Sequence, residues 1–186
     1  MVKYVTGTLA GGLVAYAWAM FAWAVLPFNM SHFSNIKDEE KVSAMISRSM
    51  PERGIYLLPG MPDTRDLDDK AAEKANLATM ERRLQGPVGF FVVAPRGAKG
   101  FTTVLTTGLL IHLLGAFCMV YIVRRSTRLN AVQTGLYTAV IALTGGVLCQ
   151  FPLWNWWEFP TGYIIGQMAD LGIGWFLAGL AIARFT

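Results

Sequence analysis

Four separate stretches of the chain are each long and apolar enough to cross a lipid bilayer as a helix. A spanning helix needs about 20 mostly apolar residues. The four stretches are residues 4–28, 101–123, 131–151 and 161–183. The composition agrees, because 54% of the 186 residues are hydrophobic and only 15% are charged, whereas an ordinary soluble domain has about 25% charged residues. The sequence therefore predicts an α-helical integral membrane protein with four transmembrane helices.

The charged residues divide this chain into three parts. Residues 29–100 contain 11 of the 16 Lys and Arg residues and 10 of the 12 Asp and Glu residues. We therefore expect transmembrane helix 1 within residues 1–28, an extramembrane cap at 29–100, and a three-helix transmembrane bundle at 101–186. The short connections within the bundle predict that its three helices pack as antiparallel neighbours.

The cap has the sequence pattern of a small α+β unit inserted between helices 1 and 2. Apolar residues recur at helical spacing after Asp38, and good helix formers follow Asp69, so two helices are predicted. The apolar runs 55–58 and 88–93 predict two short strands that pair with each other. The acids Asp63, Asp66, Asp68 and Asp69 are interpreted as the start of the second helix, with weak cation binding as the alternative.

The basic residues predict an orientation. Arg124, Arg125 and Arg128 follow the second membrane helix, and Lys3 and Arg184 lie near the termini, whereas residues 152–160 contain no basic residue. By the positive-inside rule both termini are predicted to be cytoplasmic and the cap periplasmic, as in a multi-pass protein of a bacterial inner membrane. The first apolar stretch is longer than that of a signal peptide, so we expect it to be retained.

Two ionisable residues lie at similar depth inside the predicted spans. Asp170 is the only acid in a span and His112 the only histidine. Counted from the outer ends of their helices, their depths agree within about 3 Å at 1.5 Å per residue. We expect a contact between them, joined by Gln167 one turn away. Such a pair can hold helices or subunits together, handle protons or ions, or contact a lipid or quinone-like molecule.

Small residues recur every four positions on three of the helices, which is typical of close helix packing in membranes. The predicted packing ridges contain Gly7 and Gly11 on the first helix, Gly108 on the second, and Gly162, Gly166 and Gly174 on the fourth.

Three of the six Trp residues lie in one predicted turn between the last two helices. They are Trp154, Trp156 and Trp157, followed by Glu158. The cluster is interpreted as an interfacial anchor, with a protein docking surface as the alternative. In the second case Glu158 would pair with Arg96 or Lys99 of the cap.

No motif predicts catalysis, a cofactor or a metal site. Cys118 and Cys149 lie at different depths and are predicted to be buried free thiols. His32 is interpreted as an interfacial polar residue, and a single haem ligand paired with a Met stays open. No basic stripe with interleaved aromatics predicts nucleic-acid binding.

The function predicted from these features is non-enzymatic. We expect an accessory, assembly or stabilising subunit of a larger membrane complex, in contact with lipids and with other membrane protein subunits. The alternative is a small transporter or proton or ion relay that uses His112 and Asp170, perhaps as a homo-oligomer, although the chain shows no inverted repeat.

Overall fold

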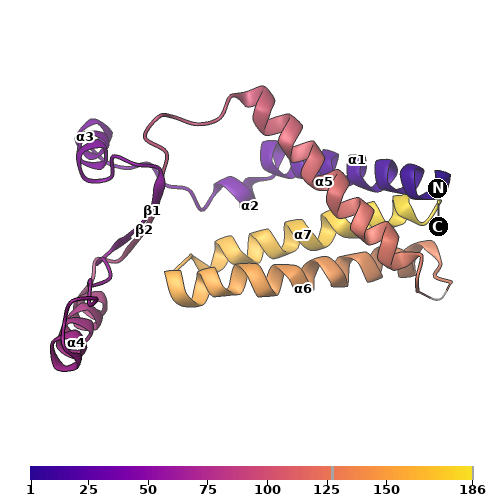
Figure 1. The fold of residues 1–186 in the computed structure, drawn as a ribbon. Coiled ribbons are helices and arrows are strands. Elements are labelled where there is room, and N and C mark those ends of the chain that lie inside the picture. The colour runs from indigo at the N-terminus through magenta and orange to yellow at the C-terminus, as the bar shows by residue number, and fades with distance from the viewer. Residues whose placement is uncertain (127, 186) are drawn as a thin grey trace. The chain divides into compact units, whose positions relative to one another are not determined.

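The computed structural model describes residues 1–126 and 128–185 (Figure 1). The helices and strands are α1 (Val2–Val25), α2 (Pro27–Met30), α3 (Glu39–Ser49), β1 (Gly54–Leu58), α4 (Asp69–Gln85), β2 (Gly89–Val93), α5 (Phe101–Val123), α6 (Ala131–Trp157) and α7 (Thr161–Ile182). They form two units, a helical unit of residues 1–34 and 99–186 and a cap of residues 35–98. Helices α1, α5, α6 and α7 are long and apolar enough to cross a membrane. The predicted fold class is therefore confirmed, and the chain is a multi-pass membrane protein.

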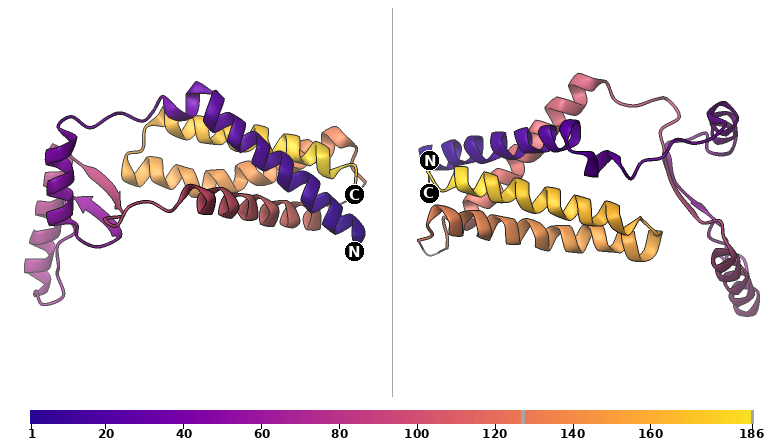
Figure 2. Two further views of the ribbon diagram at one scale, coloured as in Figure 1. Left: turned by 90° about the horizontal axis from the view of Figure 1, so that it is seen from above. Right: turned by 180° about the vertical axis from the view of Figure 1, so that it is seen from behind.

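Helix α1 lies in the middle of the helical unit. It packs against both α5 and α7, and α7 packs along α6, whereas α5 touches α6 and α7 only sparsely. Figures 1 and 2 show α6 and α7 side by side and α5 crossing at an angle. The expectation that α5, α6 and α7 pack as successive neighbours is thus wrong for α5 and α6, although their connection is short.

Glycines on α1 explain this arrangement, because they let two helices approach the same segment. A Cβ on Gly12 would lie 3.0 Å from the Cα of Leu113 on α5. A Cβ on Gly11 would lie 2.6 Å from the Ile182 side chain of α7, and one on Gly7 would meet Val120 of α5. The buried core therefore forms where α1, α5 and α7 converge, around the fully buried Val120 and Ile182.

The closest approach of α6 and α7 is also built on glycines. A Cβ on Gly179 would lie 2.7 Å from the Cα of Gly135 and 2.9 Å from the carbonyl oxygen of Thr134. The hydroxyl of the fully buried Thr138 donates a hydrogen bond of 2.8 Å to the carbonyl of Trp175 across this contact. Backbone proximity and an interhelical hydrogen bond thus join the two helices at this point, and elsewhere along the pair Phe176 packs on Gly135 and Leu171 packs on Gly146.

Helix α6 is longer than the sequence predicted. It continues through Pro152 to Trp157 and ends at Glu158, whose φ of 57° is left-handed. The predicted end at residue 151 was the end of the apolar stretch. Proline is tolerated inside membrane helices, where the freed carbonyl finds other partners. Most of the predicted aromatic turn is therefore the last part of α6.

The cap contains the predicted elements. Strands β1 and β2 form an antiparallel pair in which Tyr56 lies opposite Phe91, so the predicted pairing is confirmed. The Asp68 carboxylate accepts a hydrogen bond of 2.8 Å from the Ala71 backbone N–H and caps α4. All cap residues are described, and Thr79 and Val93 are the buried ones among them. The core of the cap is accordingly very small.

The predicted burial of the two cysteines is wrong. Cys118 of α5 and Cys149 of α6 are free thiols, but both are exposed on the surface of the helical unit. In a membrane helix an apolar side chain faces lipid as readily as it faces a neighbouring helix, so composition alone does not mark the buried face.

Candidate functional site

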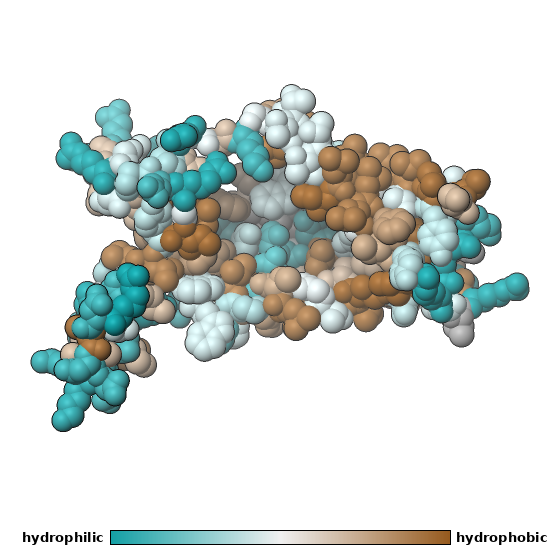
Figure 3. Space-filling model, in the orientation of Figure 1, coloured by the Kyte–Doolittle hydropathy of each residue, from teal (hydrophilic) through white to brown (hydrophobic). Residues whose placement is uncertain are grey.

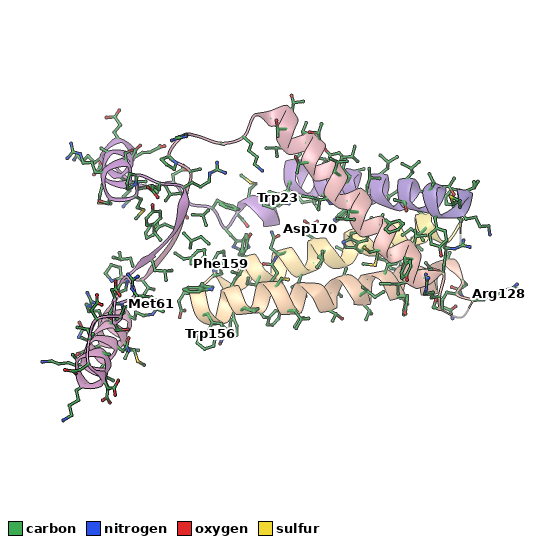
Figure 4. The ribbon with its side chains drawn as sticks, viewed as in Figure 1. Trp23, Met61, Arg128, Trp156, Phe159 and Asp170 are labelled. Atoms are coloured by element: carbon green, nitrogen blue, oxygen red, sulfur yellow. The ribbon has the colours of Figure 1, made fainter. Side chains whose placement is uncertain are left out.

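A polar cavity lies between α1, α5, α6 and α7 of the helical unit. Its volume is about 110 Å³. Its lining residues are Ala15, Trp18, Ala19, His112, Gln150, Gln167, Asp170, Leu171, Gly174 and Trp175. Figure 3 shows hydrophilic surface in a hollow of this unit between apolar surfaces, and Figure 4 labels Asp170 on α7.

Asp170 is held by the first helix. The indole Nε1–H of Trp18 donates a hydrogen bond of 2.7 Å to the Asp170 carboxylate and approaches the Asp170 carbonyl oxygen at 3.2 Å. A Cβ on Gly174 would lie 2.7 Å from Cδ1 of Trp18, so this glycine makes room for the indole. The carboxylate therefore has a fixed position and one engaged oxygen.

His112 is held by its own helix and by Tyr16. Its Nδ1 lies 2.7 Å from the carbonyl oxygen of Gly108, one turn earlier on α5. A carbonyl only accepts, so Nδ1 carries a proton and a neutral ring keeps Nε2 as its acceptor. The Tyr16 ring packs edge-on against the imidazole with centroids 5.6 Å apart, and its hydroxyl donates to the carbonyl of Leu105.

The structure brings the three predicted polar residues to one cavity without joining His112 to Asp170 directly. Both side chains line the cavity, as does Gln167, and His112 and Asp170 are close enough to interact electrostatically. Within residues 1–126 and 128–185 no hydrogen bond or ion pair links the two. The partner of Asp170 is Trp18 instead, because α1 lies between α5 and α7.

Sequence reasoning missed two residues of this site, Trp18 and Gln150. An indole N–H inside a span needs an acceptor, and Asp170 is the only carboxylate in a predicted span, so the pairing had a signal in the sequence. No signal in the sequence pointed to Gln150, because this residue lies next to the predicted end of its helix. Its Oε1 is buried in the structure and accepts no hydrogen bond from the described protein groups.

The predicted glycine ridges of α5 and α7 face aromatic side chains more than each other. Gly108 lies near Tyr16, Gly174 near Trp18, and Gly162 near His32, whose Cε1 would be 2.5 Å from an added Cβ. Gly166 is buried on α7. Gly108, Gly162 and Gly174 thus accommodate rings supplied by α1 and by the residues that follow α2.

The aromatic residues at the end of α6 form a second, shallower site. The Trp154 indole donates a hydrogen bond of 3.1 Å to the hydroxyl of Thr161, and Trp156 is 67% exposed. A pocket of about 390 Å³ lies beside them, lined by Trp154, Asn155, Glu158, Phe159, Pro160 and Thr161. Trp157 is half-buried. The contact of Glu158 with Arg96 or Lys99 stays a prediction.

Two of the four acids before and at the start of α4, Asp63 and Asp68, have structural partners. The Arg65 guanidinium donates to the Asp63 carboxylate at 2.6 and 2.9 Å. This hydrogen bond and one from the Arg65 backbone lower the pKa of Asp63 below its ordinary value. In the part of the chain that the structure describes, no three His, Cys, Asp or Glu side chains are grouped to hold a metal ion.

Comparisons of the chain with protein-family models, curated proteins and solved structures find no match. The functional argument therefore rests on the geometry of the helical unit and of the cap.

Proposed function

We propose that this membrane protein is a non-enzymatic accessory, assembly or stabilising subunit of a larger membrane complex, and that its cap is the docking module. The observation that carries the proposal is the exposure of apolar side chains on α4. Leu77, Met80 and Leu84 are 58%, 61% and 88% exposed. Their spacing places them on one face of the helix. Outside the bilayer such a face is costly, because covering each side chain would contribute about 1.5–3 kcal/mol.

The opposite face of α4 carries smaller residues. On this face Thr79 is buried, and Ala72 and Ala75 are half-buried. The larger apolar side chains of α4 are thus exposed, whereas several of its small residues are covered. An amphipathic face left without an intramolecular partner is a common docking element for a second protein.

The hairpin of the cap offers a second apolar surface. Ile55 of β1 lies opposite Val92 of β2, and the two side chains are 65% and 74% exposed. Directly opposed residues on adjacent strands point to the same side of the sheet. The cap therefore has two apolar surfaces for a partner.

The charge pattern of α4 favours a protein over a lipid surface. Its first turns carry Asp69, Lys70, Glu73 and Lys74, and its last turns carry Glu81, Arg82 and Arg83. Helices that lie on anionic lipid carry an excess of Lys and Arg on their polar face, whereas acids and bases are nearly balanced on α4. A polar rim around an apolar centre is typical of a protein interface.

The experiment is co-purification of the tagged full-length protein from native membranes in a mild detergent. We expect a stoichiometric larger complex for the wild type, and loss of the partner for the double variant Leu77→Glu, Leu84→Glu at unchanged membrane insertion. The matched control is Asn76→Glu, an exposed polar position on the same helix. A lone monomer or homo-oligomer, or a partner retained by the double variant, would contradict the proposal.

A second function is favoured by the polar cavity. A carboxylate and an imidazole that line one intramembrane cavity can pass protons or hold an ion. In this proposal the protein is a small transporter or a proton or ion relay. Proteoliposomes with a pH-sensitive dye test it: wild-type protein should dissipate an imposed pH gradient, and Asp170→Asn and His112→Ala should not. Equal rates for all three proteins and for protein-free vesicles would rule it out.

A further inference from the structure

The pocket beside the end of α6 lies at a surface of the membrane. Helices α6 and α7 are consecutive membrane spans joined by residues 158–160, so this turn lies where a span leaves the bilayer and meets the lipid headgroups. The pocket volume of about 390 Å³ is within the range of about 300–1,000 Å³ that is usual for small-molecule sites. Its lining residues Trp154, Asn155 and Glu158 are exposed. The pocket is therefore open to molecules of the headgroup layer.

Two features of the pocket attract positive charge. In residues 1–126 and 128–185 the carboxylate of Glu158 has no ion-pair partner. Glu158 also follows the last residue of α6, whose last turn contains no basic residue. The C-terminal end of a helix is the negative end of its dipole and is stabilised by a cation. No Lys or Arg occurs between Arg128 and Arg184, so neither α7 nor the turn supplies that cation.

Two aromatic rings of the lining favour an ammonium group as the cation. Trp154 and Phe159 line the pocket together with Glu158. The Trp154 indole donates a hydrogen bond of 3.1 Å to the Thr161 hydroxyl, which ties the ring across the turn. Aromatic faces attract ammonium groups, and Trp does so best. A metal ion needs several oxygen ligands, and no group of three His, Cys, Asp or Glu side chains occurs in the described part of the chain.

From these observations we propose that the pocket binds the headgroup of a phospholipid with a primary ammonium group, such as phosphatidylethanolamine. An ammonium has three N–H donors, which the Glu158 carboxylate and the Asn155 amide oxygen accept. Trp154 and Phe159 contact its positive charge. The phosphate lies toward Thr161, whose hydroxyl accepts from Trp154 and keeps its own proton to donate. The pocket thus has an acceptor side and a donor side, which complements a zwitterion.

The proposal is independent of docking by the cap and of ion handling by the polar cavity. It gives the aromatic end of α6 a specific lipid ligand in place of a general affinity for the membrane surface. Trp156 provides the comparison, because it is 67% exposed on the same turn of α6 and does not line the pocket. A general anchor would use both indoles, whereas a headgroup site uses Trp154.

The test is native mass spectrometry of the purified full-length protein in a mild detergent. The protein is titrated with phosphatidylethanolamine, phosphatidylcholine or phosphatidylglycerol of matched acyl chains. We expect saturable binding of phosphatidylethanolamine, about tenfold tighter than that of phosphatidylglycerol, because an anionic headgroup without an ammonium is repelled by Glu158. Phosphatidylcholine lacks N–H donors and should bind more weakly than phosphatidylethanolamine.

Variants of the lining separate the headgroup site from general lipid contact. Glu158→Gln should weaken phosphatidylethanolamine binding by about fivefold, since it removes a charge-assisted hydrogen bond. Glu158→Gly should do the same in a residue that suits the left-handed φ of 57°, so the loss cannot be assigned to misfolding. Trp154→Leu should weaken binding by about threefold, and the matched control Trp156→Leu should leave it unchanged.

Four results would overturn the proposal. Equal binding of the three lipids, or equal losses for Trp154→Leu and Trp156→Leu, would show lipid adhesion without a headgroup site. Undiminished binding in both Glu158 variants would remove the carboxylate from the site. Phosphoethanolamine without acyl chains that binds as tightly as the lipid would identify a soluble amine as the ligand. Binding only after the double change Arg96→Gln, Lys99→Gln would show that basic side chains of this chain occupy the pocket.

Discussion

The indole of Trp18 on α1 donates a hydrogen bond of 2.7 Å to the carboxylate of Asp170 on α7, although 152 positions separate the two residues. This bond joins the first membrane helix to the last one. It also gives the only acid of the predicted spans a fixed partner in a setting where an unpaired carboxylate is costly.

Trp18→Phe should destabilise the helical unit. The variant keeps an aromatic ring next to Gly174 but removes the N–H that Asp170 accepts. Intramembrane hydrogen bonds contribute about 0.6–1.7 kcal/mol, and a bond to a charged group lies at the upper end of that range or above it. The free energy of unfolding, measured by titration with SDS in mixed micelles, should fall by about 1–2 kcal/mol. Trp23→Phe is the control, since Trp23 is 40% exposed. Equal losses for both variants would contradict the assigned bond.

Gly179→Ala should loosen the contact between α6 and α7. The added methyl group would meet the backbone of Gly135 and Thr134 at 2.7 and 2.9 Å, and backbone atoms cannot yield as a flexible side chain does. Overpacking of this kind costs about 1–3 kcal/mol. Gly145→Ala on α6 is the matched control, because nothing lies within 4 Å of its added Cβ. The SDS titration should separate the two variants, and a neutral Gly179→Ala would refute the close approach.

The Asp63 carboxylate should titrate below its ordinary pKa. Arg65 stabilises the charged form, so the contribution of the pair to the stability of the cap is complete above the unfolded pKa and is lost as the pH falls through the folded pKa. Carbon-13 NMR of the carboxyl group measures the midpoint directly. Arg65→Gln should raise it toward the ordinary value. An unchanged midpoint in that variant would show that the ion pair does not form in solution.

Both chain ends should lie on the cytoplasmic side of the membrane, with the cap opposite. The expectation follows from the basic residues after α5 and at the two termini, because Lys and Arg in short flanks stay inside. In a bacterial host, green fluorescent protein fused to either terminus should fluoresce, and alkaline phosphatase inserted near Gly60 in the cap should be active. The reverse pattern would invert the orientation.

Local patterns in the sequence determined the elements of this protein. Apolar length predicted the four membrane helices, and the start of α4 at Asp69 follows from the capping chemistry of Asp68. Two short apolar runs bounded by turn residues predicted the strands β1 and β2, which pair in the structure. Counting residues from the outer ends of their helices predicted that Asp170 and His112 lie at the same depth in the membrane. In the structure both residues line one cavity.

Only the tertiary structure decided which faces of the helices meet. In water the apolar side of a helix marks its buried face, but lipid is as apolar as a protein core, so the pattern of Leu, Ile and Phe leaves the neighbours of a membrane helix open. The position of α1 between α5 and α7, the outward placement of Cys118 and Cys149, and the pairing of Asp170 with Trp18 depend on how glycines and rings far apart in the chain fit together. That fit is a property of three-dimensional packing, which no local pattern encodes.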